Sequence, residues 1–544
     1  MHTPGLYWRT IRHLTARQIF GRVWFRLYRP RPDLRPAPPL RVPVGVWRNP
    51  AQRLPAMTGP SAFTFLNEGG LLDPHQADGG WDDPARSKLW RYNLHYFDDL
   101  NAEHADARRD WHLALIRDWI RHNPPGQGTG WEPFPTSLRI VNWIKAALGG
   151  FALPADALVS LAIQTRWLSR QVEHHLSGNH LLANAKALCF AGVFFQSAEA
   201  DGWFKQGRQI LQRQLPAQIL PDGGHYELSP MYHALVLEDL LDLANLTRCF
   251  GADDALRRQI EARIGPMCAW LKALGHPDGD IAFFNDAVLG IAPAPTALNA
   301  YAERLGFGSA ATTPTGVTHL KQSGYLRVAR GSAVLLIDAA KVGPEHQPGH
   351  AHADTLSFEL SLDNKRVLVN SGTSEYGTGP ERLRQRGTAA HNTLTINGRN
   401  SSEVWSGFRV GRRAYPRDLH IVQGEHDTYV TASHDGYRFL PGSPLHHRRW
   451  RLGAGMLTIQ DGVSGPLQQT EARYHFAPGI QLHGHDKCGF AEQDGCLLLR
   501  WEAVEGCARI EQYTHHPRFG VSLPAQCLTL ACATNRATLR LIFA

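Results

Sequence analysis

Several features that would assign a protein to a simple class are absent from this chain of 544 residues. No apolar run approaches the roughly 20 residues that a membrane-spanning helix needs. The amino-terminal segment has no clean apolar core and no small-residue cleavage site, so no standard signal peptide is visible. RNP-like and zinc-finger patterns are also missing, which makes nucleic acid the weakest of the anionic partners considered.

Cysteine and charged residues are both sparse. The eight cysteines form no C-x-x-C pair. Disulfides in the carboxy-terminal part and isolated buried thiols therefore both remain open. Charged residues make up 19% of the chain and hydrophobic residues 43%, which excludes a disordered chain. The net charge of +8 indicates an anionic partner, and a membrane surface or an acidic polysaccharide fits better than nucleic acid.

A basic amphipathic segment opens the sequence. Five arginines stand among its Leu, Ile, Val, Phe and Trp residues: Arg9, Arg12, Arg17, Arg22 and Arg26. This pattern predicts a helix that either makes peripheral membrane contact or packs on the next domain. The Pro-rich residues 29–43 should be extended. Residues 1–45 are therefore expected to form a helix and a linker.

The hydrophobic period divides the rest of the chain into two parts. From about residue 100 to 306 the spacing is helical, with short loops, which predicts helical hairpins arranged as a ring or a solenoid. From about residue 318 the period is two, and strands follow one another without helices, which predicts an antiparallel β-sandwich. The expected fold class is a multidomain α+β protein, with a helical domain over 46–315 and a β domain over 316–544.

Two polar clusters fall in the helical part. In HHLSGNHLLANAKAL, Asn179 and His180 stand where a helix should begin, and a helix start favours an anion. In PDGGHYELSPMYH, Ser229-Pro230 should open a helix with Tyr232 and His233 in its first turn. A tyrosine there can exchange protons if nearby cations lower its pKa from about 10. Simple capping by Asn179 and packing of Tyr232 are the alternatives.

A third cluster opens the β domain. The stretch HQPGHAHADTLSFEL alternates His350, His352 and Asp354 before a predicted strand, so the three share a face. Histidines in this pattern suit zinc or a similar ion. His391, at the start of a later strand, can complete such a site.

Together these motifs resemble the heparinase II/III family of polysaccharide lyases. The resemblance runs from about residue 90 to 410 and includes WRYNLHYFDDL, SGNHLLANAKAL, DGGHYELSPMYH, GHAHADTLSFEL and HNTLTINGRN in the family's order. It implies an (α/α) toroid, an incomplete helical barrel, followed by an antiparallel β-sandwich. It also implies β-elimination on an anionic polysaccharide that contains uronic acid.

The resemblance assigns roles residue by residue. Asn179 and His180 match the position that neutralises the substrate carboxylate, and Tyr232 and His350 match the base and the acid. Residues expected to bind substrate come from matching motifs: Asn93, His95, Tyr96, Trp131, Arg139 and His233. The family's metal position maps onto His352, Asn370 and His391, with zinc expected in a structural role. Asn370 departs from the aspartate that many members carry there.

Alternative functions remain open on the sequence alone. A glycoside hydrolase on the same toroid would need two carboxylates across a cleft, with Glu132, Glu227 and Asp286 available. A non-catalytic polysaccharide-binding protein of an exopolysaccharide pathway would bind without releasing product. The family resemblance implies a periplasmic or cell-envelope location, although the missing signal peptide also fits a cytoplasmic one.

Overall fold

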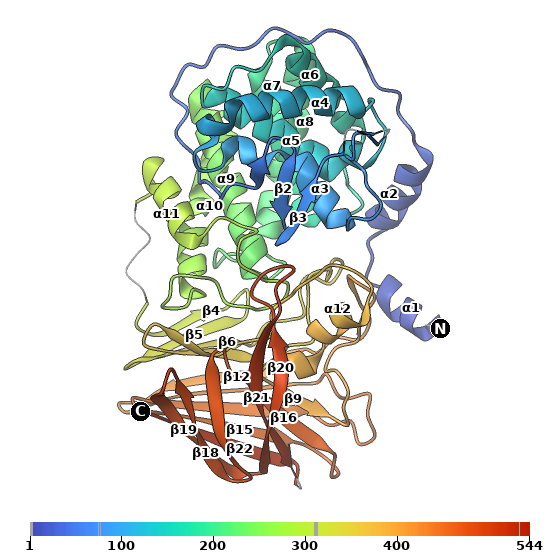
Figure 1. Ribbon diagram of the computed structural model, residues 1–544. Helices are drawn as coiled ribbons and strands as arrows, with labels where there is room; N and C mark the ends of the chain where they lie inside the picture. Colours follow the sequence, from blue (N-terminus) through green and yellow to red (C-terminus); the bar gives the residue numbers. More distant parts are fainter. Residues whose placement is uncertain (1–3, 74, 77, 309–313, 533) are drawn as a thin grey trace.

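The computed structural model describes residues 4–73, 75–76, 78–308, 314–532 and 534–544. A helical domain stands above a β domain, and the chain passes between them after α11 (Figure 1). The first two helices, α1 (Pro4–Ile11) and α2 (Ala16–Leu27), lie beside the junction of the two domains (Figure 1). The junction therefore has contacts from both domains and from the amino terminus.

The helical domain is an incomplete ring of antiparallel helices. Its helices are α3 (Lys88–Tyr96), α4 (Arg109–His122), α5 (Pro133–Leu148), α6 (Ala155–Arg170), α7 (Gly178–Phe194), α8 (Ala198–Gln218), α9 (Pro230–Phe250), α10 (Asp254–Ala273) and α11 (Pro295–Arg304). Almost every residue of α7 is buried, because other helices pack on all its sides. Helix α6 ends at Arg170, and a turn leads to Gly178.

The Pro-rich segment after α2 runs across the outside of this ring (Figure 1). Arg166 donates to the carbonyl oxygens of Arg35 and Pro36. Further on, the backbone N–H groups of Val44 and Gly45 donate to the Cys249 carbonyl. The extended conformation predicted from the prolines is confirmed, and the backbone groups that it leaves free are bonded by the helices beneath.

The β domain contains three main antiparallel sheets. The first has the order β4 (Gly316–Leu320), β5 (Tyr325–Arg330), β6 (Ala333–Asp338), β7 (Phe358–Leu362), β8 (Lys365–Leu368). The second has the order β20 (Cys507–His515), β21 (Leu523–Cys532), β16 (Thr470–His475), β9 (Leu394–Ile396). The third has the order β12 (Pro416–Gln423), β13 (Asp427–His434), β14 (His446–Gly453), β15 (Met456–Val463), β22 (Arg536–Phe543), β19 (Cys496–Glu505), β18 (Cys488–Gln493), β17 (Ile480–His485).

Strand alternation builds the core between these sheets. In β14 the burial pattern changes at each residue, so Trp450 faces inward while Arg449 and Arg451 face outward. A short helix, α12 (Pro380–Gln385), lies on the side that faces the helical domain (Figure 1). The strands β10 (Val404–Trp405) and β11 (Arg409–Val410) form a two-stranded ribbon.

The toroid-and-sandwich fold class expected from the sequence is confirmed. The sequence analysis missed a small sheet before α3, formed by β1 (Met57–Gly59), β2 (Ala62–Phe65) and β3 (Glu68–Leu71). All eight cysteines lie in described parts of the chain and are free thiols. The expectation of buried thiols holds for Cys189, Cys249, Cys268 and Cys527, whereas Cys488, Cys496 and Cys507 are exposed. Among the described residues, no helix combines the length and apolarity needed to span a bilayer.

A buried cluster of charged and polar groups ties four helices of the ring together. Asp242 of α9 accepts from Lys145 of α5 at 2.8 Å and from Lys186 of α7 at 2.6 Å. The hydroxyl of Tyr301 in α11 donates to the same carboxylate at 3.0 Å. Burial opposes ionisation, but the two lysines lower the pKa of Asp242 to about 2, so the carboxylate is charged.

Replacing Asp242 with alanine should lower the free energy of unfolding by about 3–5 kcal/mol, because two buried ammonium groups would lose a shared partner. Urea denaturation followed by circular dichroism measures this loss. Asp254→Ala is the matched control, since Asp254 forms an exposed pair with Arg257 and its removal should leave the unfolding midpoint unchanged. Equal midpoints for both variants would contradict this role of the cluster.

Candidate active site

Helix α9 begins at the residue pair that the sequence indicated. The Ser229 side chain accepts a hydrogen bond from the Tyr232 backbone N–H at 3.2 Å, and Pro230 occupies the first helical position. The Ser229 hydroxyl also donates to the carbonyl of Asp286 at 2.6 Å. The cap therefore fixes Tyr232 in the first turn and links it to the loop that carries Asp286.

Asp286 is a fully buried carboxylate where the two domains meet. It comes from the helical part of the chain, and its partners come from the β domain. His350 Nδ1 lies 2.9 Å from Oδ2, and His352 Nε2 lies 2.8 Å from Oδ1. Arg382 of α12 binds both oxygens, with 2.7 Å to Oδ2. Burial alone would raise the pKa of Asp286, but Arg382 and the two histidines hold it well below its usual range.

His350 and Tyr232 are in direct ring contact. Their ring centroids are 3.8 Å apart, and the rings are nearly parallel. The Tyr232 hydroxyl lies 3.0 Å from the hydroxyl of Tyr376. Burial raises the pKa of the Tyr232 phenol far above its ordinary value. The lowered pKa that the sequence analysis considered is wrong for this state of the protein, because burial outweighs the nearby Arg382.

A tight backbone approach places Asn179. Gly178, the first residue of α7, has a positive φ of 56°, and a Cβ there would lie only 2.6 Å from Glu227 Oε1. That oxygen accepts from the Asn179 backbone N–H at 3.2 Å. Among the described residues the Asn179 side-chain amide forms no hydrogen bond with the protein, so it is available for a ligand. Glycine is required here both for φ and for space.

His180 follows Asn179 and lies over Phe134, with ring centroids 4.2 Å apart. Its Nδ1 is 3.1 Å from Glu173 Oε2. Burial would lower the pKa of His180, but the Glu173 carboxylate outweighs it and raises the pKa above 6.5. The ring therefore favours the cationic form beside the free Asn179 amide.

Four of the predicted substrate-binding residues are core residues instead. Arg139 is fully buried over the Trp119 ring and donates to the carbonyls of His95 and Gly130. His95 accepts from the Trp119 indole at 3.0 Å. The other two are His233 and Trp131, with 0% and 3% exposure. Direct sugar contact is therefore wrong for these four, since their polar groups are bonded inside the protein or closed off from solvent.

The remaining predicted substrate residues, Asn93 and Tyr96, stay predictions. Asn93 is half-buried, and its amide nitrogen donates within α3 to Leu89. Tyr96 is 6% exposed and lies edge-on to Phe134, the residue that supports His180. Both residues lie on α3, and Arg139 lies on α5.

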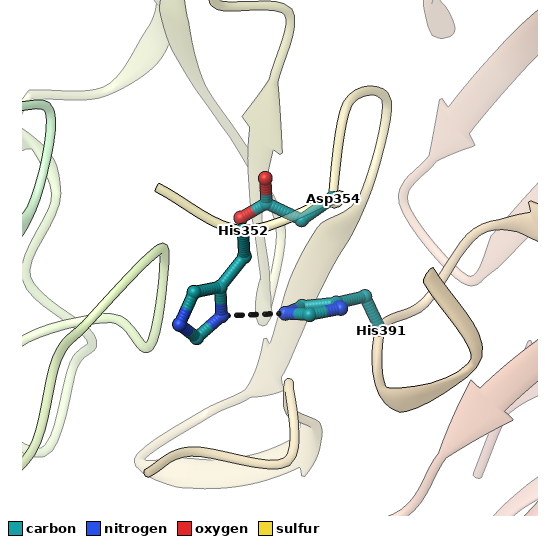
Figure 2. Close-up of side chains that lie close together, drawn as sticks. All are labelled: His352, Asp354 and His391. Carbon is teal, nitrogen blue, oxygen red and sulfur yellow. Dashed lines mark hydrogen bonds between the residues drawn. The ribbon is translucent and has the colours of Figure 1, made fainter. Parts of the chain in front are cut away.

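His352 and His391 face each other with nitrogen atoms 3.0 Å apart (Figure 2). His352 Nε2 must carry its proton, because it donates to the Asp286 carboxylate. His391 Nδ1 must carry its proton too, because its 2.8 Å partner is the Gly387 carbonyl. In neutral rings the two facing nitrogens are then both lone pairs, which requires a shared proton or a cation between them.

A second histidine pair shows how such a contact is satisfied without a cation. His446 Nδ1 and His434 Nε2 are also 3.0 Å apart, inside the β domain. There His434 Nδ1 accepts from the Gly436 N–H, so His434 Nε2 is a donor. His446 Nε2 can then donate to Asp461 at 2.6 Å. In this pair each contact has one donor and one acceptor, whereas the contact between His352 and His391 has two acceptors and no donor.

A carboxylate lies beside the pair formed by His352 and His391. Ligand atoms of His352, Asp354 and His391 all lie within 4.8 Å of one another (Figure 2). Burial lowers the pKa of His352 to about 4 and also lowers that of His391, which disfavours a shared proton at neutral pH. Two imidazole nitrogens and one carboxylate are a donor set that fits zinc. The Asn370 amide oxygen, by contrast, already accepts from the Asn392 N–H at 3.2 Å.

Sequence reasoning missed three residues of this centre. Asp286, Tyr376 and Arg382 are separated from Tyr232 by about 50 to 150 positions along the chain. Tyr376 lies in the stretch NSGTSEYG, to which the sequence analysis assigned no role beyond Asn370. Asp286 was considered only as one carboxylate of a hydrolase, and nothing in its local sequence indicates four donors.

Two family models match the chain. The model described as "Heparinase II/III N-terminus" covers residues 83–304, and "Heparinase II/III-like, C-terminal" covers residues 312–537. A "Heparin-sulfate lyase" from Bacteroides stercoris is 28% identical over 280 residues, which are 47% of this chain and 41% of that protein. The chain thus spans about two fifths of the length of that relative.

Two further relatives cover more of the chain. "FtsZ-localized protein C" from Caulobacter vibrioides is 27% identical over 536 residues, 91% of this chain and 87% of that protein. The crystal structure of heparinase III has a TM-score of 0.68 at 18% identity and covers 86% of this chain and 80% of its own. At that identity the structural match concerns the fold.

Stability should fall as the pH drops below 6.5, because several buried histidines are neutral in the folded protein. Burial lowers the pKa of His233 to about 4, although its bond to the Met267 carbonyl opposes this. Between pH 6.5 and 4 the unfolded chain binds the proton and the folded chain does not, so stability is complete above 6.5. For His233 the loss at pH 5 is about 2 kcal/mol.

Urea midpoints at pH 7 and pH 5 measure this difference, and His233→Gln should reduce it. His426→Gln is the control, because His426 is exposed to water before and after unfolding. An unchanged pH difference in His233→Gln would contradict the assignment.

Proposed function

Because the chain belongs to the heparinase II/III family, we propose that it is a lyase that cleaves a uronic-acid-containing polysaccharide by β-elimination. The observation that carries the proposal is the His350–Tyr232 ring contact, fixed from behind by Asp286. A proton acceptor, a proton donor and a group that can neutralise a carboxylate then lie around one site.

Neutralisation of the substrate carboxylate falls to the start of α7. The C5 proton of a uronate is too weakly acidic while the adjacent carboxylate keeps its full charge. The unengaged Asn179 amide and the His180 ring, whose pKa is raised, can both donate to that carboxylate. They would stabilise the negative charge that builds up as the C5–H bond breaks.

His350 is the base in this proposal. Its Nδ1 donates to Asp286 at 2.9 Å, and Nε2, which lies 3.5 Å from Glu227 Oε2, is the proton acceptor. Asp286 also stabilises the imidazolium that forms when Nε2 takes the C5 proton. Arg382 keeps this carboxylate ionised, so the orientation of His350 does not depend on the substrate.

Tyr232 is the acid. Burial raises the pKa of the phenol, so the resting enzyme holds the proton that the departing C4 oxygen needs. The balance is complete: the C5 proton goes to His350, the C5–H electrons form the C4–C5 double bond, and the C4–O bond breaks. Tyr232 then gives its proton to O4. For the other C5 epimer, Tyr232 would take both roles, as the family resemblance implies.

A zinc ion in a structural role completes the proposal. His352 Nδ1, His391 Nε2 and the Asp354 carboxylate would hold it, so the third ligand is Asp354 and not Asn370. When bound, the ion supplies the positive charge that two facing lone pairs require. Because His352 also donates to Asp286, a fixed His352 ring would help orient that carboxylate toward His350.

The glycoside hydrolase alternative has less support. It needs one carboxylate as an acid and another as a base or nucleophile. Both oxygens of Asp286 are engaged by Arg382, His350 and His352. Glu132 pairs with Lys88 and accepts from Tyr92. Of the three carboxyl groups, this leaves Glu227 alone, and a hydrolase would need a second one opposite it.

A non-catalytic role is the second candidate. The relative aligned over 91% of this chain is named for its localisation to FtsZ, whereas the Bacteroides stercoris lyase aligns with 47% of it. A protein of an exopolysaccharide pathway would then bind polymer without cleaving it. The intact His350–Tyr232–Asp286 arrangement argues for catalysis.

The substrate class and the location extend the proposal. The net charge of +8 suits an anionic polymer. The heparin-sulfate lyase relatives act on one such polymer by name, and for this chain we propose only the wider class of uronic-acid polysaccharides. A periplasmic or cell-envelope site is where such polymers are made and remodelled, and it stays our prediction.

Tyr232→Phe should abolish elimination, with a loss of about 100-fold or more in kcat, because the acid is removed while the ring contact remains. The assay follows far-UV absorbance during incubation with a panel of uronic-acid polysaccharides, since the C4–C5 double bond of the product absorbs.

Tyr429→Phe is the matched control, because Tyr429 lies on β13 far along the chain from the site. Full activity in Tyr232→Phe would contradict the mechanism. New reducing ends without absorbance would favour the hydrolase, and tight binding without any product would favour the non-catalytic protein.

Purified protein should contain about one zinc ion per chain, measured by mass spectrometry of the metal content. His391→Ala and Asp354→Asn should lose it, because each removes one proposed ligand. Asn370→Ala should retain it. Loss in Asn370→Ala with retention in Asp354→Asn would restore the ligand set expected from the family, and protein that takes up no zinc would exclude the ion.

A further inference from the structure

The first two helices expose an unusual amount of apolar surface. On α2, Phe20, Trp24 and Leu27 are 70%, 54% and 75% exposed, and we call these three the aromatic stripe. The Phe20 and Trp24 rings stack with centroids 6.4 Å apart, and Trp24 stacks in turn on Tyr28. On α1, Trp8 is 68% exposed. A contiguous apolar surface of this kind marks an interaction site.

The opposite side of these helices is firmly packed, so the exposure is not a sign of a loose segment. A Cβ at Gly21 would lie 2.9 Å from the His175 Cβ, and Phe25 contacts the same ring. Gln18 donates to the His346 carbonyl at 3.0 Å. Arg9 of α1 forms a two-point bond with Glu403 of the β domain. The stripe therefore faces outward on a rigid support.

A basic pocket of about 190 Å³ lies at the amino-terminal end of the stripe. Arg17 and Arg213 provide its positive charges, and His174, Gln206, Gln209 and Gln214 line it as well. Arg17 donates to His174 Nδ1 at 2.8 Å, and Arg213 has no ion pair among the described residues. The lining contains no acidic residue. The pocket therefore suits a small anionic group.

The positive charge of the amino-terminal segment indicates an anionic partner for this surface. Seven arginines and no acidic residue occur before Asp33. Arg17, Phe20 and Trp24 are spaced by three and four residues, so the pocket and the stripe are on one face of α2. Aromatic rings and arginines on one helix face are typical of a helix that lies in the interface of an anionic bilayer.

We propose that α1 and α2 dock this protein on an anionic lipid bilayer, with the aromatic stripe in the interfacial region and the basic pocket around a lipid phosphate. The docked helices contact His175 and His346, which precede Asn179 and His350 in the chain. Docking would therefore hold an edge of the proposed active site near the membrane surface. This proposal does not depend on the lyase chemistry.

The test is co-sedimentation of the full chain with vesicles of phosphatidylcholine, alone or mixed with phosphatidylglycerol. The wild type should bind the mixed vesicles and lose binding at high salt. Phe20→Ser/Trp24→Ser should weaken binding by more than about tenfold. Val422→Ser/Leu467→Ser, which removes two equally exposed apolar residues elsewhere, should leave binding unchanged.

A second pair of variants tests the pocket. Arg17→Ala/Arg213→Ala should weaken binding more than Arg26→Ala/Arg29→Ala, for which about fivefold per arginine is expected from charge alone. Equal losses would exclude the phosphate pocket. Equal binding to both vesicle types, or to neither, would overturn the proposal. Concentration-dependent dimers that Phe20→Ser/Trp24→Ser abolishes in ultracentrifugation would identify a second copy as the partner instead.

Discussion

One buried carboxylate organises the proposed active site. Asp286 has zero exposure and receives two bonds from Arg382 and one each from His350 and His352. A buried charge is tolerated only when its lone pairs are filled, so the β domain must bring all three donors to one point on the helical domain. The hydrogen bond from His350 that helps to satisfy Asp286 thus also orients the His350 ring against Tyr232.

The direction of each proton follows from that carboxylate. Since Asp286 fixes the proton of His350 on Nδ1, Nε2 is left to accept one, and Tyr232 keeps its own because burial raises its pKa. The same carboxylate also fixes the proton of His352 on Nε2, so His352 Nδ1 faces His391 Nε2 without a proton to share. The closed proton chain of His434 and His446 shows that this fold can satisfy a histidine pair without a cation. The difference between the two pairs supports a metal beside the cleft.

The sequence predicted the features that neighbouring residues determine, such as helix starts and strand alternation. Ser229-Pro230 indicated the start of α9 and with it the place of Tyr232. The alternation of His350 and His352 predicted that their side chains share a face, and in the structure both reach Asp286. Periodicity separated the helical ring from the sheets. Arg139 was misjudged because an arginine in an amphipathic helix can be buried when backbone carbonyls accept its donors. Asp286, Tyr376 and Arg382 were beyond reach, because only tertiary packing brings them together.

The most direct test of elimination is the mass of the products formed in heavy-oxygen water. Elimination adds no water to the cleaved bond, so the new unsaturated end should carry no heavy oxygen and should lack the mass of one water molecule. His350→Ala should form no such product, since the proton acceptor is gone. Products that lack the unsaturated end and together carry the mass of one added water molecule would show that water attacks the bond, and this would contradict the roles of His350, Tyr232 and Asp286.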